Sequence, residues 1–296
     1  MKRILIVAAG GGYDILTVHL AAWAVQRRYP ECTVEIGGML NPKFRHFYFP
    51  DPNTVFSETV VRQINGLTCV RFRVAPSYEQ IPLAEYSYAE CMGAFPQKDF
   101  PDGRTAAVSE MTLYHLSPRL DTDALVSFLC GYDRVFFCDV GGDILYAGAE
   151  NREVQTPLMD AYALVLAKKC TEQGTDCRLW VIAPGADREL SPAHLRANLL
   201  RVGAEYREIP PEDAQRLWEM YLQVRTGDHG KTIRHIHAAV CGETLTEELK
   251  QYGDLLHQTA ECDLRAAVSA NPLALAENWQ GVLQIGSVLL GRQSGI

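Results

Sequence analysis

The chain has 296 residues, of which 47% are hydrophobic and 22% are charged, and its formal net charge is −8. This globular composition with an acidic balance argues against a nucleic-acid binder that relies on general electrostatic attraction. Nine cysteines are scattered without a C-x-x-C pair. A disulfide framework or a four-thiolate zinc site is therefore not expected, and the cysteines fit a reducing, cytoplasmic location.

Residues 3–9 form a continuous apolar run bounded by glycines, which predicts a buried parallel strand. The run is too short for a signal peptide, and no later stretch is long and apolar enough to span a membrane, so we expect no membrane partner. Asp14 can cap a following helix that ends near Pro30, and residues 33–36 predict a second strand. This β-loop-α-β opening is typical of a doubly wound sheet.

The segment 40–120 is rich in aromatic residues, prolines and turns, and its clearest strand pattern lies at 69–74. We predict that part of this segment is an irregular excursion or lid on a single α/β domain spanning residues 1–296.

The second half of the chain alternates helix and strand patterns. Helices are expected at 121–131, 156–170, from 191 onward, 211–224 and 231–240; strands at 134–140, 178–183 and 262–269; and a closing element at 281–290. The fold class predicted is α/β, with a doubly wound, mostly parallel, Rossmann-like sheet and helices on both faces.

Three predicted strands run into loops that combine glycine with aspartate. The loops are Gly10-Gly11-Gly12-Tyr13-Asp14, Asp139-Val140-Gly141-Gly142-Asp143 and Pro184-Gly185-Ala186-Asp187. Ligands of open α/β sheets bind at the carboxyl ends of the strands, where glycines let backbone N–H groups come close to them. Carboxylates at these ends can hold a divalent cation, pair with a cationic substrate, or act as acid and base.

The acidic residues of these loops and of the segment after them are the main candidates for function. The candidate catalytic residues are Asp139, Asp143, Glu150 and Asp160; the candidate ligands of Mg²⁺ or Mn²⁺ are Asp139 and Asp143; the candidate ligand contacts are Gly10, Gly11, Gly12, Asp14, Gly141, Gly142 and Asp187. The structural alternative is that glycine and aspartate are ordinary turn residues and that aspartate caps helices. This alternative has the least weight for Asp139 and Asp143, which flank two glycines beside an apolar strand.

A second candidate is an anion site near residues 225–232. This stretch resembles a Walker A loop but has Arg225 in place of the first glycine. Lys231 opens a helix whose N–H groups can receive an anion, with Arg225 nearby, and a plain helix start is the alternative. His235 and His237 would suit a metal in a strand, whereas in a helix their side chains diverge.

Other known motifs are incomplete. A dinucleotide fingerprint would need a glycine where Ile15 stands, so NAD binding has weak support, and no Gly-x-Ser-x-Gly elbow occurs.

An ordered set of motifs resembles the family called domain of unknown function 1152. The motifs are Gly10-Gly11-Gly12-Tyr13-Asp14, Asp139-Val140-Gly141-Gly142-Asp143, Gly148-Ala149-Glu150, Thr156-Pro157-Leu158-Met159-Asp160 and Pro184-Gly185-Ala186-Asp187-Arg188-Glu189-Leu190. The resemblance would cover about residues 3–240, and it implies an α/β fold and a shared site but no reaction. This chain departs from the family in having Thr156 where the family usually has serine, and in lacking a tryptophan block near residues 40–45.

Together these patterns favour an enzyme that hydrolyses a small polar metabolite or transfers a group from it, since no cofactor fingerprint is present. A non-catalytic domain that binds or senses a small molecule or a nucleotide is the alternative, and a dehydrogenase is a third hypothesis. Several carboxylates gathered at one site favour the enzyme, because a simple binding domain has no need of them. The sequence leaves open whether the protein forms a homo-oligomer.

Overall fold

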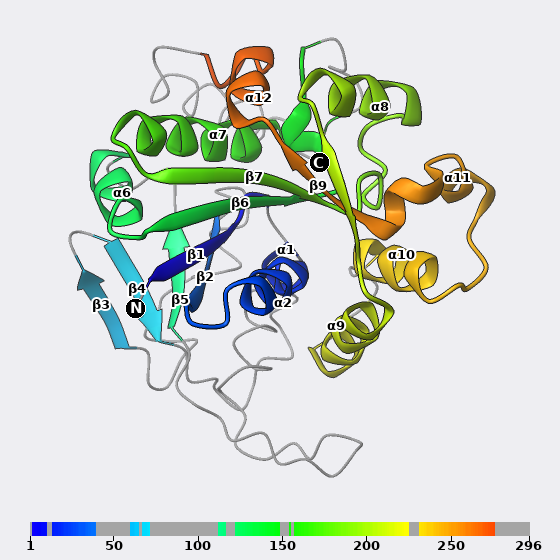
Figure 1. The fold of residues 1–296 in the computed structure, drawn as a ribbon, viewed down its shortest axis with the longest axis horizontal. Coiled ribbons are helices and arrows are strands. Elements are labelled where there is room, and N and C mark those ends of the chain that lie inside the picture. The colour runs from blue at the N-terminus through cyan, green and yellow to red at the C-terminus, as the bar shows by residue number, and fades with distance from the viewer. Residues whose placement is uncertain are drawn as a thin grey trace, which may run out of the picture.

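A computed structural model describes residues 2–10, 14–39, 60–64, 67–71, 112–116, 122–148, 154, 157–224 and 231–275, and the strands in this part of the chain form one nine-stranded sheet (Figure 1). The order of strands across the sheet is β3-β4-β5-β2-β1-β6-β7-β9-β8. The strands are β1 (Arg3–Ala8), β2 (Thr33–Met39), β3 (Val60–Ile64), β4 (Leu67–Arg71), β5 (Thr112–Leu116), β6 (Arg134–Val140), β7 (Asp176–Ile182), β8 (Glu205–Glu208) and β9 (Gln258–Cys262).

The five central strands, β5-β2-β1-β6-β7, are parallel to one another. Along the chain, β2 and β5 are added on one side of β1, and β6 and β7 on its other side. The strand order therefore reverses between β1 and β6, which is where open α/β sheets form their ligand crevice. Ala8 pairs with Cys138, and Val140 pairs with Ile182, so the three strands end close together at this point.

The sheet is mixed, so the expectation of a mostly parallel sheet was wrong. The pairs β3–β4, β4–β5, β7–β9 and β8–β9 are antiparallel, which is half of the eight neighbouring pairs. For β3 and β4 the reason lies in their short connection, because a parallel neighbour needs a crossover of a dozen or more residues. Only residues 65–66 separate β3 from β4, and β9 comes back along β7 in the opposite direction.

Helices cover both faces of the sheet (Figure 1). The helices are α1 (Asp14–Thr17), α2 (His19–Arg28), α6 (Thr122–Leu129), α7 (Pro157–Glu172), α8 (Pro192–Arg201), α9 (Pro211–Val224), α10 (Lys231–Val240), α11 (Glu247–Lys250) and α12 (Leu264–Ala270), with short 3₁₀ turns η4 (Asp143–Leu145) and η5 (Gly253–His257). Helix α7 packs on β6 and β7 with α6 and α12 beside it. On the other face, α1 packs on β1, β2 and β6, and α2 and α9 lie next to it.

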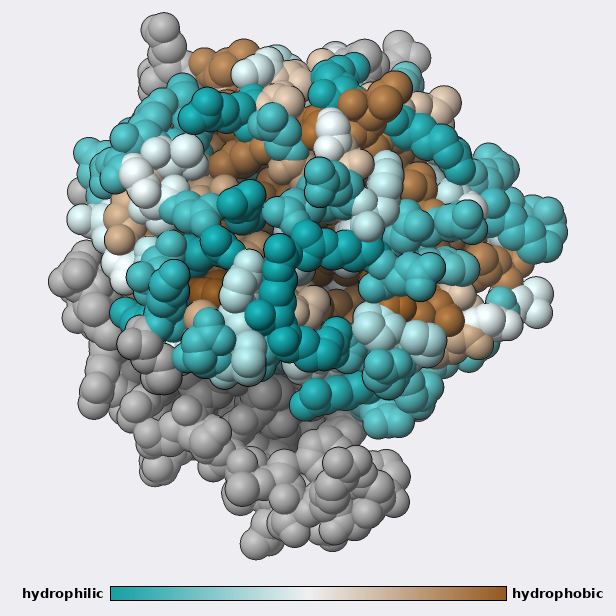
Figure 2. Space-filling view, in the orientation of Figure 1, coloured by the Kyte–Doolittle hydropathy of each residue, from teal (hydrophilic) through white to brown (hydrophobic). Residues whose placement is uncertain are grey.

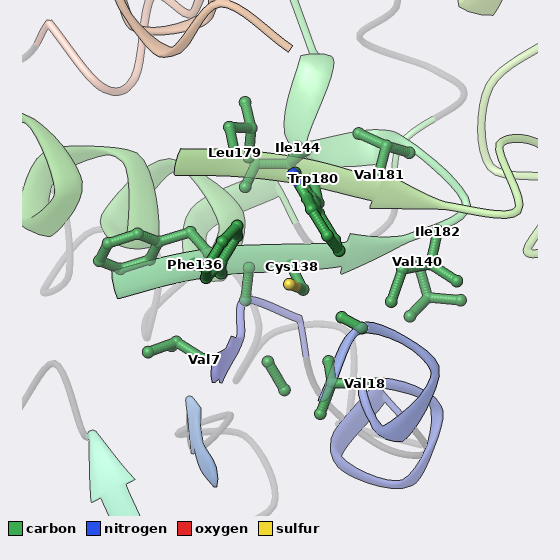
Figure 3. Packing of buried hydrophobic residues seen from close by; sticks show 14 of the residues in the cluster. Val7, Val18, Phe136, Cys138, Val140, Ile144, Leu179, Trp180, Val181 and Ile182 are labelled. Carbon is green, nitrogen blue, oxygen red and sulfur yellow. The ribbon is translucent and has the colours of Figure 1, made fainter. Parts of the chain in front are cut away.

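The core fills the space between the central strands and these two layers of helices. Figure 3 shows Phe136, Cys138 and Val140 of β6 beside Trp180 and Ile182 of β7. The rings of Phe136 and Trp180 meet edge to face with their centroids 4.8 Å apart. Both strands are nearly inaccessible to solvent over most of their length, as expected for parallel strands covered on both faces. The ends of β6 and β7, from which the glycine–aspartate loops begin, are therefore held in place by a close-packed interior.

Most elements expected in the second half of the chain are confirmed, and one is wrong. The segment 262–269 is not a strand, because β9 ends at Cys262 and Asp263 caps α12, where its carboxylate accepts hydrogen bonds from the backbone N–H groups of Arg265 and Ala266. The expected helix after Asp14 is divided at Val18 into α1 and α2. The closing element expected at 281–290 lies outside the described residues.

Four strands that the sequence analysis did not find belong to the sheet, namely β3, β5, β8 and β9. The strand expected at 69–74 is β4, shifted toward the N-terminus. Apart from β3, β4 and β5, the predicted excursion at 40–120 lies outside the described residues.

The described surface in the view of Figure 2 is mainly hydrophilic, with hydrophobic atoms showing between polar side chains. In the part of the chain that the structure describes, no helix has the length and apolar character needed to cross a bilayer.

Candidate functional site

Three aspartates from different elements converge beyond the end of β6. Asp139 lies near the end of this strand, Asp143 begins the 3₁₀ turn that follows it, and Asp160 lies in the first turn of α7. Carboxylate oxygens of the three residues lie within 4.8 Å of one another. The residues are 0%, 6% and 1% exposed, so three acidic groups share a space that is almost closed to solvent.

A second acidic group adjoins the first through Asp143. Carboxylate oxygens of Asp143, Asp187 and Glu189 also lie within 4.8 Å of one another. Asp187 follows β7 and is 9% exposed, and its carboxylate accepts a hydrogen bond from the backbone N–H of Glu189 at 3.1 Å. Asp14, the first residue of α1, is partly exposed and lies against Gly10 at the end of β1. We call these six residues, Asp14, Asp139, Asp143, Asp160, Asp187 and Glu189, the acidic cluster.

Two glycines of the predicted loops make room for the acidic cluster. A Cβ atom on Gly10 would collide with the carboxylate of Asp14, and a Cβ atom on Gly141 would occupy the place of the Asp187 carboxylate. Gly141 also has a φ of +107°, a conformation that side chains rarely adopt. At these two positions, glycine lets a carboxylate rest directly on the backbone of a strand end.

The most deeply buried carboxylates are only weakly compensated by their neighbours. Both oxygens of Asp139 and both oxygens of Asp160 are inaccessible to solvent and have no hydrogen-bond partner among the described residues. None of the five aspartates of the cluster forms a salt bridge with a described lysine or arginine. A buried charge is stable only when it is paired, hydrogen-bonded or bound to a metal, so these groups need protons or a cation.

Burial is the main cause of a raised pKa at every aspartate of the cluster. It raises the pKa of Asp139 to about 6, while the Asp143 carboxyl and nearby backbone amides limit the rise. The pKa values of Asp14, Asp143 and Asp160 are raised well above 3.8, first by burial and then by repulsion from other carboxylates. The pKa of Asp187 is raised for the same reasons, although the charge of Lys231 opposes the rise. The cluster therefore holds fewer charges at neutral pH than separate aspartates would.

The structure thus brings Asp14, Asp139, Asp143, Asp160 and Asp187 together, as the loop pattern predicted. Lys231 is the exposed first residue of α10 and its charge acts on Asp187, which places it beside the cluster. Gly142 has a φ of +113°; a Cβ atom there would collide with Leu195, and its backbone amide is one of those that limit the pKa rise of Asp139. The candidates Gly11, Gly12, Glu150 and Arg225 lie outside the described residues.

Two residues near the cluster were not assigned a role from the sequence. Glu189 follows Asp187 by two positions, and the only sequence signal was its place in the same loop. His235 lies with its Nδ1 atom 2.6 Å from the carbonyl oxygen of Ala186. His237 points elsewhere, toward Gln215 and the ring of Trp218, so the two histidines diverge as a helix requires.

The comparisons with known proteins agree with the family resemblance over part of the chain. Residues 120–241 match the model of the family described as "Protein of unknown function (DUF1152)". The resemblance is confirmed for this region. The matched region holds four of the five clustered aspartates and Lys231, whereas Asp14 and Gly10 precede it. No curated protein and no solved structure shows a significant match.

The raised pKa values predict how the stability of the metal-free protein changes with pH. A carboxyl whose pKa is higher in the folded state binds a proton more tightly there, so the free energy of unfolding falls as pH rises from the unfolded pKa through the folded one. For Asp139 this window is 3.8 to about 6, and the loss is about 3 kcal/mol at about 1.4 kcal/mol per pKa unit.

We therefore expect Asp139→Asn to raise the melting temperature of the metal-free protein at pH 7 by several degrees, and to raise it less at pH 5. The measurement is thermal unfolding from pH 5 to 8 in the presence of a chelator. Asp254→Asn, which removes an exposed carboxylate from η5, is the control and should change little. A lower melting temperature for Asp139→Asn at pH 7 would contradict the idea that this charge is uncompensated.

The close approach at Gly141 gives a second prediction. Gly141→Ala should destabilise the protein more than Gly174→Ala, because both glycines have positive φ values, +107° and +92°, but only Gly141 has a carboxylate where the Cβ atom would lie. Urea unfolding of the two variants measures the difference, and backbone strain contributes similarly to both. Equal destabilisation would show that the Asp187 carboxylate does not rest on Gly141.

Proposed function

We propose that the protein is an enzyme that binds a divalent cation, Mg²⁺ or Mn²⁺, at the acidic cluster and hydrolyses a small polar metabolite or transfers a group from it. One observation carries the proposal. Asp139, Asp143 and Asp160 come from three separate elements, share one buried space, and leave four carboxylate oxygens without hydrogen-bond partners among the described residues. Burying such groups lowers the stability of the folded protein, and this cost favours a functional role for the three aspartates.

The residues present suit a hard divalent cation. All the donors are carboxylate oxygens, which Mg²⁺ and Mn²⁺ prefer, and no described cysteine or histidine is among them. Asp139, Asp143 and Asp160 would hold the ion, because their oxygens already lie within 4.8 Å of one another. A bound ion of this kind supplies positive charge that polarises a substrate oxygen and lowers the pKa of a water molecule.

Asp187 and Glu189 suit a different role, at the rim of the same site. Asp187 is less deeply buried than Asp139 and Asp160, and Glu189 is half-buried. A carboxyl group whose pKa is raised well above 3.8 accepts and releases a proton closer to neutral pH, as an acid–base group must. In this proposal Asp187 moves the proton while the deeper aspartates hold the charge of the ion.

The position of the site in the fold supports the proposal. The cluster lies beyond the ends of β1, β6 and β7, at the reversal of strand order where ligands of open α/β sheets bind. The residues next to these aspartates in the sequence are packed in the core. The fold therefore fixes the distances between the carboxylates.

The metal part of the proposal predicts the behaviour of Asp143→Asn. Mn²⁺ or Mg²⁺ should raise the melting temperature of the parent protein, since an ion that binds only the folded state stabilises it. Asp143→Asn should lose most of this rise and keep its circular dichroism spectrum, and Asp254→Asn should respond like the parent. An equal response in Asp143→Asn and the parent would remove Asp143 from the site.

The enzymatic part needs its own measurement. The parent protein is incubated with a mixture of polar metabolites, with Mn²⁺ or with a chelator, and the products are followed by mass spectrometry. We expect turnover of at least one metabolite with Mn²⁺ and its loss in the chelator and in Asp143→Asn. Metal binding with no turnover of any metabolite would instead support a non-catalytic binding domain.

A further inference from the structure

The loop that carries Asp187 also contains Arg188 and is contacted by His235 of α10, the helix that Lys231 begins. We propose that Arg188, Lys231 and His235, here called the cationic rim, bind a phosphate group of the substrate beside the acidic cluster. The inference deepens the proposed function by naming the substrate class, a small phosphorylated metabolite, and it rests on that function for the metal side of the site.

The contact between His235 and Ala186 joins α10 to this loop. A carbonyl oxygen only accepts hydrogen bonds, so at 2.6 Å the Nδ1 atom of His235 must donate to the carbonyl of Ala186. This bond fixes the orientation of the ring and leaves Nε2 without a hydrogen-bond partner among the described residues. Nε2 donates to a ligand only when the ring is protonated, and a bound anion favours that form. Ala186 directly precedes Asp187, so the ring is held against the loop that joins the acidic cluster.

Lys231 places a positive charge on the same side of α10. It precedes His235 by four positions, so the two side chains lie on one face of the helix, one turn apart. Its ammonium group is exposed, forms no salt bridge with any described residue, and acts on the charge of Asp187. The charge of Lys231 thus acts on both the histidine and the acidic cluster.

Arg188 adds a donor on the loop itself. Its backbone has a φ of +65°, unusual for a residue with a side chain, and non-glycine residues in this region collect at functional sites. Its Nη1 atom is paired with Glu248 at 2.6 Å, whereas its buried Nε donor has no partner among the described residues. An oxygen atom of a ligand would satisfy this donor.

The charges around His235 indicate an anionic ligand. Burial lowers the pKa of His235, and the positive charges of Arg188, Lys231 and Arg234 lower it further. Glu248 already pairs with Arg188, and a bound anion would further reduce the repulsion between these positive groups and a protonated His235.

A phosphate group suits both sides of this loop better than a carboxylate does. Mg²⁺ is commonly bound by one or two carboxylates together with oxygens of a substrate phosphate. A tetrahedral dianion has oxygens for the ion and further oxygens for the Arg and Lys donors, and its charge favours the protonated form of His235, whose Nε2–H then also donates. The cationic rim would hold the phosphate in place while the acidic cluster holds the ion.

The test measures binding of inorganic phosphate by titration calorimetry, with and without Mn²⁺. We expect Lys231→Ala to weaken phosphate binding about tenfold or more, as the loss of a charged hydrogen bond does. Lys231→Arg should retain most of the affinity. Lys168→Ala, which removes an exposed positive charge from α7, is the control and should bind phosphate like the parent.

A pair of histidine variants separates a ligand contact from a structural role. His235→Asn keeps an N–H group for the Ala186 carbonyl but loses Nε2, and His235→Gln places an amide closer to the position of Nε2. We expect His235→Asn to lose phosphate affinity with little change in melting temperature, and His235→Gln to retain more of it. Acetate, tested in parallel, should bind the parent more weakly than phosphate.

The outcomes distinguish this inference from the proposed function. Parent-like phosphate affinity in both Lys231→Ala and His235→Asn would overturn the cationic rim, even if Mn²⁺ binds at the acidic cluster. Phosphate binding that depends on these residues, in a protein that does not bind Mn²⁺, would support the cationic rim and reject the metal proposal. Equal affinity for acetate and phosphate would overturn the assignment of a phosphorylated substrate.

Discussion

Carboxylates that are held close together and away from water are the feature on which the account of this protein depends. Water would solvate Asp139 and Asp160 in an unfolded chain, whereas in the folded protein no described residue makes a hydrogen bond of good geometry to their oxygens, and the Asp143 carboxyl and loop amides compensate Asp139 only in part. Each of these groups must then bind a proton or share a cation, because an isolated buried charge is too costly. The raised pKa values, the glycines at the strand ends and the candidate metal site all follow from this arrangement.

The fold imposes this arrangement through the packing of its central strands. The ends of β1, β6 and β7 are anchored by a core in which most side chains are fully buried, so the loops beyond them have little freedom to separate. Gly10 and Gly141 then bring two carboxylates onto the backbone itself. Such repulsion lowers stability, and proteins commonly accept a loss of this kind where a site must be ready to bind its ligand.

Much of this site could be predicted from the sequence, because parallel strands end at the same edge of a sheet. Apolar runs at 3–9, 134–140 and 178–183 predicted the strands, and the aspartates after them were therefore expected to meet. The contacts of His235 and Glu189 could not be predicted in this way. His235 reaches Ala186 across 49 positions of sequence, and no local pattern reports such a contact.

The errors in the predicted sheet have physical reasons as well. Asn65 and Gly66 separate β3 from β4, and this pair is a strong hairpin signal that the sequence analysis passed over. The edge strand β8 is fully exposed and polar, so it lacks the apolar pattern used to find strands. The apolar residues after Asp263 are compatible with a strand or a helix. The Asp263 carboxylate caps the first backbone N–H groups of this segment, which favours the helix α12.

Crystals of the protein grown with Mn²⁺ and measured for anomalous scattering test the central claim most directly. We expect an anomalous peak within bonding distance of carboxylate oxygens from Asp139, Asp143 and Asp160. Aspartates that instead contact one another through short hydrogen bonds, with no peak between them at saturating Mn²⁺, would show that protons alone neutralise the cluster and would contradict the account.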